Sequence, residues 1–183
     1  MKTVAAAALL GFCSLVAAAQ SADGMFATGA VTSVLDGFHA AAAAADEEKY
    51  FAALAPDAVF LGTDATERWT KEEFRKFAHP YFAKGKAWTY KAKSRWISFA
   101  PDRQVAWFDE LLESPHLGTC RGSGVLVSLG GTWKIVQYNL SIPIPNALAD
   151  SVTKQIAENE KGSGLATTPP GPAPTPKSPK EKP

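Results

Sequence analysis

The chain has 183 residues, of which 46% are hydrophobic, with 19 Lys and Arg against 18 Asp and Glu and only two Cys. A net charge of +1 excludes a protein that binds nucleic acid through a broadly basic face. Two cysteines exclude a disulfide-stapled miniprotein and a zinc site built on several thiolates, and the length allows one domain with tails.

The first 19 residues have the pattern of a secretory signal peptide. Lys2 provides the positive start, residues 4–16 are almost wholly apolar, and Ala17–Ala19 form a small-residue cleavage site. The apolar run is shorter than the ~20 residues that a membrane-spanning helix needs. We therefore expect cleavage near Ala19, a periplasmic or secreted protein without a stable membrane anchor, and a linker over residues 20–30.

The C-terminal end is predicted to lie outside the folded domain as well. Residues 161–183 contain seven of the 13 prolines and no aromatic residue. Such a segment buries too little apolar surface to offset the entropy cost of ordering, so we expect a disordered tail rich in Pro and Lys. A C-terminal helix over residues 148–160 is predicted to precede it.

Two helices are predicted to open the folded core. Apolar residues recur at helical spacing on one face of the first helix: Val31, Val34, Leu35, Phe38 and Ala42. The alanines of residues 40–45 extend this helix. Asp46 is predicted to cap a second helix, which ends before Pro56.

A third helix is predicted to begin at a capping box. The Thr70 hydroxyl and the Glu73 carboxylate are placed to accept hydrogen bonds from free amides at the helix start. The helix is expected to bury three aromatic side chains: Phe74, Phe77 and Tyr81. Pro80 is expected to bend or end it.

The hydrophobic period then changes from 3.6 to 2, which is typical of strands. A short strand is predicted before the third helix, over residues 58–61, and longer ones after it, over 87–99, 104–113, 119–129 and 132–142. Gly130–Gly131 forms a hairpin turn between the last two strands. Helices on one side of a curved antiparallel meander define an α+β fold, and the sequence has no Gly-rich phosphate loop, G-x-S-x-G elbow or H-x-x-x-H zinc pair. We therefore expect no metal and no cofactor.

Removal of the signal peptide leaves Cys120 as the remaining cysteine, without an intramolecular partner. In an exported protein such a thiol is either buried or joined to another chain. Because Cys120 lies in a strand-like run, burial is predicted.

Four segments resemble the SnoaL-like proteins of the nuclear transport factor 2 superfamily: DAVFLGTDATERW (Asp57–Trp69), AWFDE (Ala106–Glu110), CRGSGV (Cys120–Val125) and WKIVQYNL (Trp133–Leu140). The resemblance covers residues 31–147. It implies a cone in which a strongly curved antiparallel sheet wraps about three helices and leaves a hollow at the wide end. Relatives include ketosteroid isomerase, scytalone dehydratase, polyketide cyclases and domains that only bind or dimerise, so the fold does not settle the function.

His39 is the first candidate catalytic residue. It lies beside the apolar stripe of the first helix, which this fold places along the hollow. Two interpretations stay open, because the ring could be a satisfied core residue or a proton carrier that faces the cavity.

A second set of candidates shares one face of the predicted sheet. Asp109 is a candidate acid or base, and five residues of the same face are candidate ligand contacts: Trp107, Arg121, Ser123, Gln137 and Asn139. Alternatively, Asp109 and Arg121 form a structural ion pair across strands.

The segment after the short strand is predicted to lie at the mouth of the hollow. Asp64 and Glu67 could act as acid and base or bind a cation, or Asp64 could simply bond to the loop backbone. Three further aromatic residues are candidate ligand contacts that could equally be cavity wall: Trp69, Tyr81 and Trp88.

These features favour an exported domain whose internal pocket binds a small, largely hydrophobic molecule with a polar group. One alternative is an isomerase, dehydratase or cyclase that abstracts a proton with His39 or an acid, while a Tyr or Arg steadies the oxyanion. The other alternative is a non-catalytic module that forms a homodimer through the sheet face. No nucleic-acid partner is expected.

Overall fold

The structure is a computed structural model that describes residues 25–163. The predicted signal peptide and residues 164–183 of the predicted tail lie outside the described residues. The chain divides into two compact units, the first ending at Pro143 and the second beginning at Ile144. The second unit consists of the 3₁₀ turn η1 (Asn146–Leu148) and helix α4 (Ala149–Ser163), where the sequence predicted a helix over 148–160.

The first unit is built on one sheet of six strands in the order β2-β1-β6-β5-β4-β3. The strands are β1 (Leu54–Leu61), β2 (Arg68–Thr70), β3 (Lys91–Phe99), β4 (Val105–Ser114), β5 (Gly118–Leu129) and β6 (Thr132–Ser141). Strands β3 to β6 form the expected antiparallel meander, and Gly130 and Gly131 make its last turn with positive φ angles of 58° and 82°. Strand β1 joins β6 in parallel, so the sheet is mixed and not wholly antiparallel as predicted. The α+β class is confirmed.

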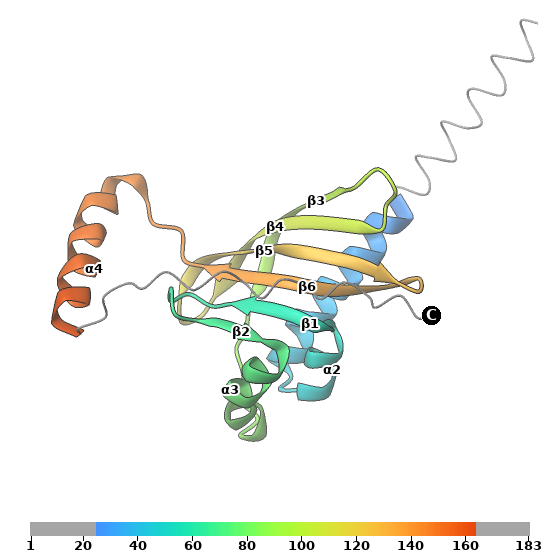
Figure 1. Cartoon of the computed structure of the whole chain (residues 1–183), viewed down its shortest axis with the longest axis horizontal. Helices are drawn as coiled ribbons and strands as arrows, with labels where there is room; N and C mark the ends of the chain where they lie inside the picture. The colour runs from blue at the N-terminus through green and yellow to red at the C-terminus, as the bar shows by residue number, and fades with distance from the viewer. Residues whose placement is uncertain (1–24, 164–183) are drawn as a thin grey trace, which may run out of the picture. The chain divides into compact units, whose positions relative to one another are not determined.

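Three helices pack on one side of this sheet (Figure 1): an N-terminal helix over residues 25–43, α2 (Glu47–Ala52) and α3 (Lys71–Ala83). The N-terminal helix includes residues 25–30, which were predicted as linker. Both predicted caps are confirmed, because Asp46 accepts from the Lys49 amide at 3.1 Å and Thr70 and Glu73 form a complete capping box. Among the described residues no helix is long and apolar enough to cross a membrane.

Helix α3 differs from its prediction in two ways. Its buried residues are Phe74, Ala78 and Phe82, spaced by four, whereas Phe77 and Tyr81 are 42% and 48% exposed. The helix also continues through Pro80 to Ala83. Because Pro80 lies at the start of the last turn, its missing N–H removes one hydrogen bond near the end of the helix.

Two β-bulges decide which side chains face the helices. In β3 the register shifts between Ala92 and Ser94, so Lys93 is an extra residue and Arg95 points to the inner face. In β6 Val136 is extra, and Ile135 and Tyr138 are therefore both buried. Without the bulges, simple alternation would have placed Arg95 on the outer face and only one of Ile135 and Tyr138 on the inner face.

The core between sheet and helices contains many stacked aromatic rings. The rings of Phe60 and Phe74 stack at 3.8 Å between centroids, and those of Phe38 and Tyr50 at 4.1 Å. Cys120 is fully buried on β5, which confirms its predicted burial. These rings form the walls of a cavity.

Candidate ligand pocket

A cavity of about 180 Å³ opens between the sheet and the helices. Nine of its 15 lining residues are aromatic, and none is Lys or Arg. The complete lining is Phe38, His39, Tyr50, Phe60, Gly62, Thr63, Glu67, Trp69, Phe74, Phe77, Trp88, Tyr90, Leu117, Tyr138 and Leu140. Buried members such as His39 form the deep end, and the more exposed Glu67, Phe77 and Leu117 form the mouth.

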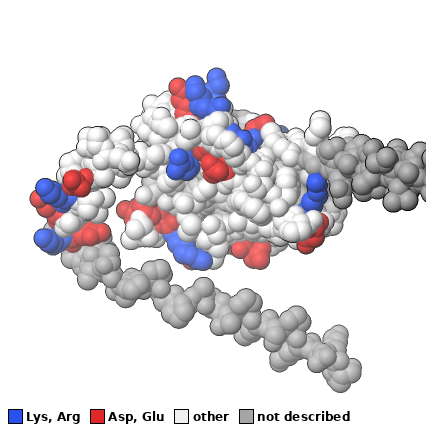
Figure 2. Space-filling model, turned by 90° about the horizontal axis from the view of Figure 1, so that it is seen from above, with Lys and Arg blue, Asp and Glu red and all other residues white. Residues whose placement is uncertain are grey.

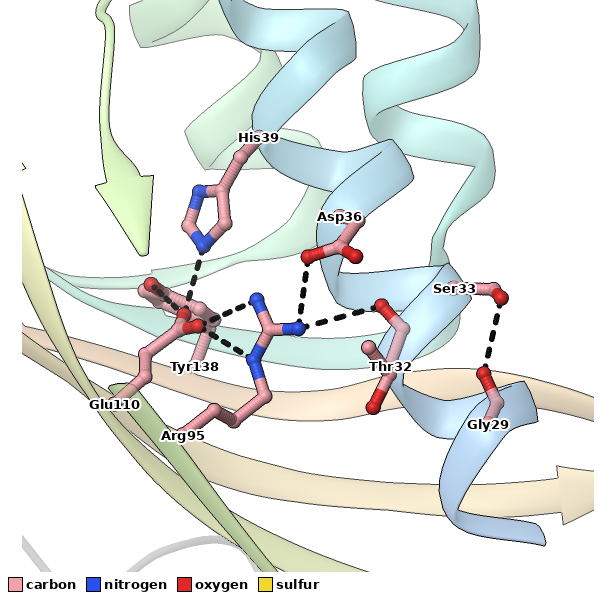
Figure 3. Close-up of polar contacts among 8 residues, drawn as sticks. All are labelled: Gly29, Thr32, Ser33, Asp36, His39, Arg95, Glu110 and Tyr138. Atoms are coloured by element: carbon pink, nitrogen blue, oxygen red, sulfur yellow. Dashed lines mark hydrogen bonds and ion pairs between the residues drawn. The ribbon is translucent and has the colours of Figure 1, made fainter. Parts of the chain in front are cut away.

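A buried carboxylate lies directly behind the deep end. Glu110 on β4 has no exposed surface and receives three side chains (Figure 3). His39 Nε2 lies 2.7 Å from its Oε1, and the Tyr138 hydroxyl donates to the same oxygen at 3.1 Å. Arg95 donates from Nε to Oε2 at 2.8 Å, and its Nη2 lies 2.7 Å from that oxygen.

Arg95 connects this cluster to the N-terminal helix. Its Nη1 donates to Asp36 Oδ1 at 2.8 Å and to the Thr32 carbonyl at 3.4 Å. The guanidinium therefore joins the sheet to the helix that carries His39 (Figure 3). The Arg95 side chain is 9% exposed and that of Glu110 has no exposed surface, so this ion pair forms away from water, whereas Asp36 is 62% exposed.

The surroundings of Glu110 keep it ionised. Burial alone would raise the pKa of Glu110, but the hydrogen bond and charge of His39 and the charge of Arg95 outweigh it and lower the pKa below its ordinary value of 4.5. Burial, reinforced by the nearby Glu110 charge, raises the pKa of Tyr138 well above 10.0. Tyr138 therefore stays protonated and donates to the carboxylate.

This arrangement assigns the tautomer of His39. An ionised carboxylate can only accept, so Nε2 carries a hydrogen, and in the neutral ring Nδ1 then carries the lone pair. Among the described residues Nδ1 has no hydrogen-bond partner, and it is not among the buried polar atoms that lack one. A buried carboxylate thus orients the ring of a histidine that lines an aromatic cavity.

Tyr90 provides a second polar group at the deep end. Its ring meets that of His39 edge-on at 6.3 Å between centroids. Burial raises the pKa of Tyr90 to about 12, with a smaller contribution from Cys120, so its hydroxyl is a donor at neutral pH. No described residue accepts from it, which leaves it available to a ligand.

Gly122 makes room for the cluster on the neighbouring strand. A Cβ at this position would overlap the Tyr138 hydroxyl and lie 2.9 Å from Glu110 Oε1. We expect Gly122→Ala to lower the free energy of unfolding by ~1–3 kcal/mol, measured by urea denaturation, because the core is overpacked. The matched control is Gly37→Ala in the N-terminal helix, where a Cβ meets nothing within 4 Å and stability should rise by ~0.5–1 kcal/mol. Equal effects of both substitutions would contradict the packing argument.

Four of the residues predicted from sequence line the pocket: His39, Glu67, Trp69 and Trp88. They come from the N-terminal helix, the segment between β1 and β2, β2 itself and the loop before β3. The structure brings them together as expected of a cavity and its mouth. Trp69 packs on Phe77 at 4.7 Å between ring centroids, so it is also part of the wall.

The predicted polar set of the sheet lies on the other face. Asp109 and its neighbours Trp107, Arg121, Ser123, Gln137 and Asn139 alternate with the inward residues and point away from the helices, so they do not line the cavity. The alternative of a structural Asp109–Arg121 ion pair directly across the strands is wrong too, because Asp109 lies opposite Ser123 and Arg121 lies opposite Leu111. The prediction failed because it took the face of Asp109 as the inner one, whereas the inner face of β4 carries the charged Glu110 between the buried Phe108 and Leu112.

Asp64 and Tyr81 do not reach the pocket lining either. Asp64 accepts from the Thr66 amide at 2.8 Å and from the Thr66 hydroxyl at 2.6 Å, which is the loop-backbone role left open above. These bonds lower the pKa of Asp64. Tyr81 follows Phe77 on the exposed side of α3.

Four residues of the cluster and pocket were not predicted from sequence: Arg95, Glu110, Tyr90 and Tyr138. A signal for Glu110 exists, because it shares one strand face with Ala106, Phe108 and Leu112, and a charged residue on an apolar face needs a partner. Arg95 has no comparable signal, since the bulge at Lys93 reverses its face. Among the described residues no cluster of three or more His, Cys, Asp or Glu is arranged to hold a metal ion.

Solved structures with the same fold include three proteins from two bacteria. A candidate scytalone dehydratase from Novosphingobium aromaticivorans gives a TM-score of 0.58 at 10% identity, covering 68% of this chain and 89% of its own. An NTF2-like protein from Pseudomonas putida gives 0.54 at 14% identity, covering 63% and 86%. A candidate aromatic ring hydroxylase from N. aromaticivorans gives 0.52 at 15% identity, covering 63% and 88%. The chain therefore has the nuclear transport factor 2-like fold.

The family follows from the sequence. The pattern of the SnoaL-like domain matches residues 31–145, close to the predicted 31–147. The chain belongs to the SnoaL-like domain family. No curated protein sequence matches it.

Proposed function

We propose that the cavity binds a small, largely hydrophobic molecule of about one aromatic ring, whose polar group lies between His39 Nδ1 and the Tyr90 hydroxyl. The observation that carries this proposal is the pair of polar atoms without protein partners among the described residues, placed in a largely aromatic lining. Such a lining with a few convergent polar groups is typical of ligand pockets. A cavity of about 180 Å³ suits one ring, since apolar cavities of ~150 Å³ bind benzene.

A pair of matched ligands tests this proposal. Acetophenone and ethylbenzene have similar shape, but only acetophenone carries a carbonyl that can accept from Tyr90. By titration calorimetry we expect wild-type protein to bind acetophenone more tightly than ethylbenzene. Tyr90→Phe should lower the affinity for acetophenone by ~3–10-fold and leave the affinity for ethylbenzene unchanged. Equal losses for both ligands would show that Tyr90 is only wall, and no binding of either would refute the pocket.

Proton-transfer catalysis is a second candidate, and the His39–Glu110 contact favours it. A base oriented by a buried carboxylate could remove a proton from the carbon beside a carbonyl, and the Tyr90 hydroxyl could donate to the oxyanion that forms. The names of two structural relatives refer to a dehydratase and a hydroxylase, but at 10% and 15% identity they support the fold alone.

Deuterium exchange tests the catalytic candidate. In D₂O the base would take a methyl proton of acetophenone and return a deuteron, which NMR detects as loss of the methyl signal. We expect wild-type protein to accelerate this exchange and His39→Gln to reduce it by ~100-fold, with an unfolding temperature close to that of wild type. Exchange at the rate of buffer in the wild type would leave a binding domain only.

Export and homodimer formation remain predictions. The apolar start of the chain supports export to the periplasm or medium. A homodimer through the outer sheet face is supported by Trp96 and Trp107, which lie diagonally on β3 and β4 and are 55% and 50% exposed.

A further inference from the structure

We infer that the pocket selects its ligands by charge, preferring an aromatic cation to the anion of the same shape, and that Glu67 at the mouth is the residue that makes this choice. This inference rests on the proposed ligand pocket and adds the charge class of the ligand. It begins from the charged groups that line the cavity. Glu67 is the one carboxylate among them, and no lining residue is Lys or Arg.

The charged cluster behind the cavity does not make the surroundings of the pocket positive. Glu110 and Asp36 contribute two negative charges there, and Arg95 contributes one positive charge. The cluster therefore carries a net charge of −1 with a neutral His39 ring and of zero with a protonated one, and is positive in neither case. On the face drawn in Figure 2, Lys and Arg are interspersed with Asp and Glu, so no field of one sign covers that face. The charge felt by a ligand comes from the groups around the pocket.

The carboxylate of Glu67 is held in place without a cationic partner. Its Oε2 accepts from the Asp64 amide at 3.2 Å, and among the described residues no Lys, Arg or His pairs with it. Gly62 at the end of β1 permits this position, because a Cβ there would overlap Glu67 Oε2 and lie 2.9 Å from its Cδ. The second oxygen remains able to accept from a ligand.

The aromatic rings near the Glu67 carboxylate also favour a positively charged ligand. Trp69 and Phe77 line the pocket with Glu67 and stack at 4.7 Å between ring centroids, so the mouth presents π-systems beside a negative charge. Aromatic faces attract cations, most strongly where water is excluded. A carboxylate ligand would lose its hydration and meet Glu67 without any positive group to compensate.

Three planar compounds of the same shape test this inference by titration calorimetry at pH 7 and low salt: benzamidinium, benzamide and benzoate. Wild-type protein should bind benzamidinium most tightly and benzoate least. Glu67→Gln keeps an acceptor for the Asp64 amide but removes the charge. It should lower the affinity for benzamidinium by about tenfold and change the affinity for benzamide by less than twofold. Gly62→Ala, which displaces the carboxylate without removing it, should act in the same direction. The control is Glu72→Gln on exposed α3, which removes one charge away from the pocket and should leave all three affinities unchanged.

The outcomes separate the two proposals. If benzamide binds but benzamidinium gains nothing, or benzoate binds most tightly, selection by charge is refuted while the pocket stands. If the preference for benzamidinium survives in Glu67→Gln, Glu67 is not the residue responsible and the inference fails. If none of the three binds to wild-type protein, the proposed pocket fails with it.

Discussion

Replacing Glu110 with Gln should lower the free energy of unfolding by about 3 kcal/mol at pH 7, measured by urea denaturation. Glu110 has no exposed surface, and Gln keeps its shape but leaves the charge of Arg95 without its nearest counter-ion. Asp36 still pairs with Arg95, which keeps the loss near the lower end of what a broken buried ion pair costs. In a domain whose free energy of unfolding has the ordinary value of ~5–15 kcal/mol, this is a large part of the total.

Glu113→Gln is the matched control on the same strand. Glu113 is 58% exposed and pairs with Lys93 at the surface, so its loss should stay below ~1 kcal/mol. The pH dependence adds a second criterion. Because the pKa of Glu110 is lowered in the folded state, its contribution is present above the ordinary value of 4.5 and is lost as the pH falls through the folded pKa. The gap between wild type and Glu110→Gln should therefore narrow in acid; a gap that is constant from pH 7 to pH 3 would contradict the ionised cluster.

Arg95→Met should destabilise the protein by a similar ~3 kcal/mol at pH 7, because it leaves the Glu110 carboxylate buried beside an apolar side chain. The variant should respond differently to pH. Without the guanidinium, the folded pKa of Glu110 lies higher than in wild type, because one of the groups that offset burial is gone, so protonation relieves the penalty at a higher pH than in wild type. The stability gap to wild type should therefore narrow as the pH falls from 7.

The control for this substitution is Arg121→Met on the outer face of β5, where the side chain is exposed and stability should change by less than ~0.5 kcal/mol. Denaturation of both variants over the same pH range checks the prediction. If Arg95→Met is no less stable than Arg121→Met, Arg95 does not hold Glu110 ionised.

The local signals in the sequence predicted most of the fold. The caps at Asp46 and Thr70, the apolar stripe of the N-terminal helix and the Gly130–Gly131 turn are each set by residues a few positions apart, and each appears in the structure. The parallel pairing of β1 with β6 was not predicted, because it joins segments far apart in the chain. Long-range pairing leaves little trace in a period-two pattern.

The candidate site was predicted only in part, and the reason lies in the two faces of β4. Both carry large apolar residues, since Trp107 and Leu111 alternate with Phe108 and Leu112, so the pattern alone does not reveal the inner face. Gly122 and Gly124 make the inner face of β5 look empty, although their lack of side chains is what admits Tyr138 and Phe108. The polar residues of the outer face then appeared to be the better candidates.

The bulge at Lys93 had the largest effect on the site. It turns Arg95 inward opposite Glu110 and leaves Trp96 exposed, which is the reverse of the alternation that starts at Trp88. A bulge adds one residue to a strand without requiring a particular residue type, so the sequence does not indicate where it lies. His39, by contrast, was placed correctly beside the hollow because helical spacing relates it directly to its neighbours in the stripe.

The tautomer of His39 tests the central claim most directly, because the whole cluster acts on the ligand through this ring. A long-range ¹H–¹⁵N correlation spectrum of labelled protein distinguishes the two nitrogens, and with three histidines in the chain the His39 signals can be assigned by their absence in His39→Gln. For the neutral ring we predict a protonated Nε2, bonded to Glu110, and a bare Nδ1 that faces the pocket. A protonated Nδ1 with a bare Nε2 would contradict the claim, since Glu110 would then orient no proton acceptor toward the cavity.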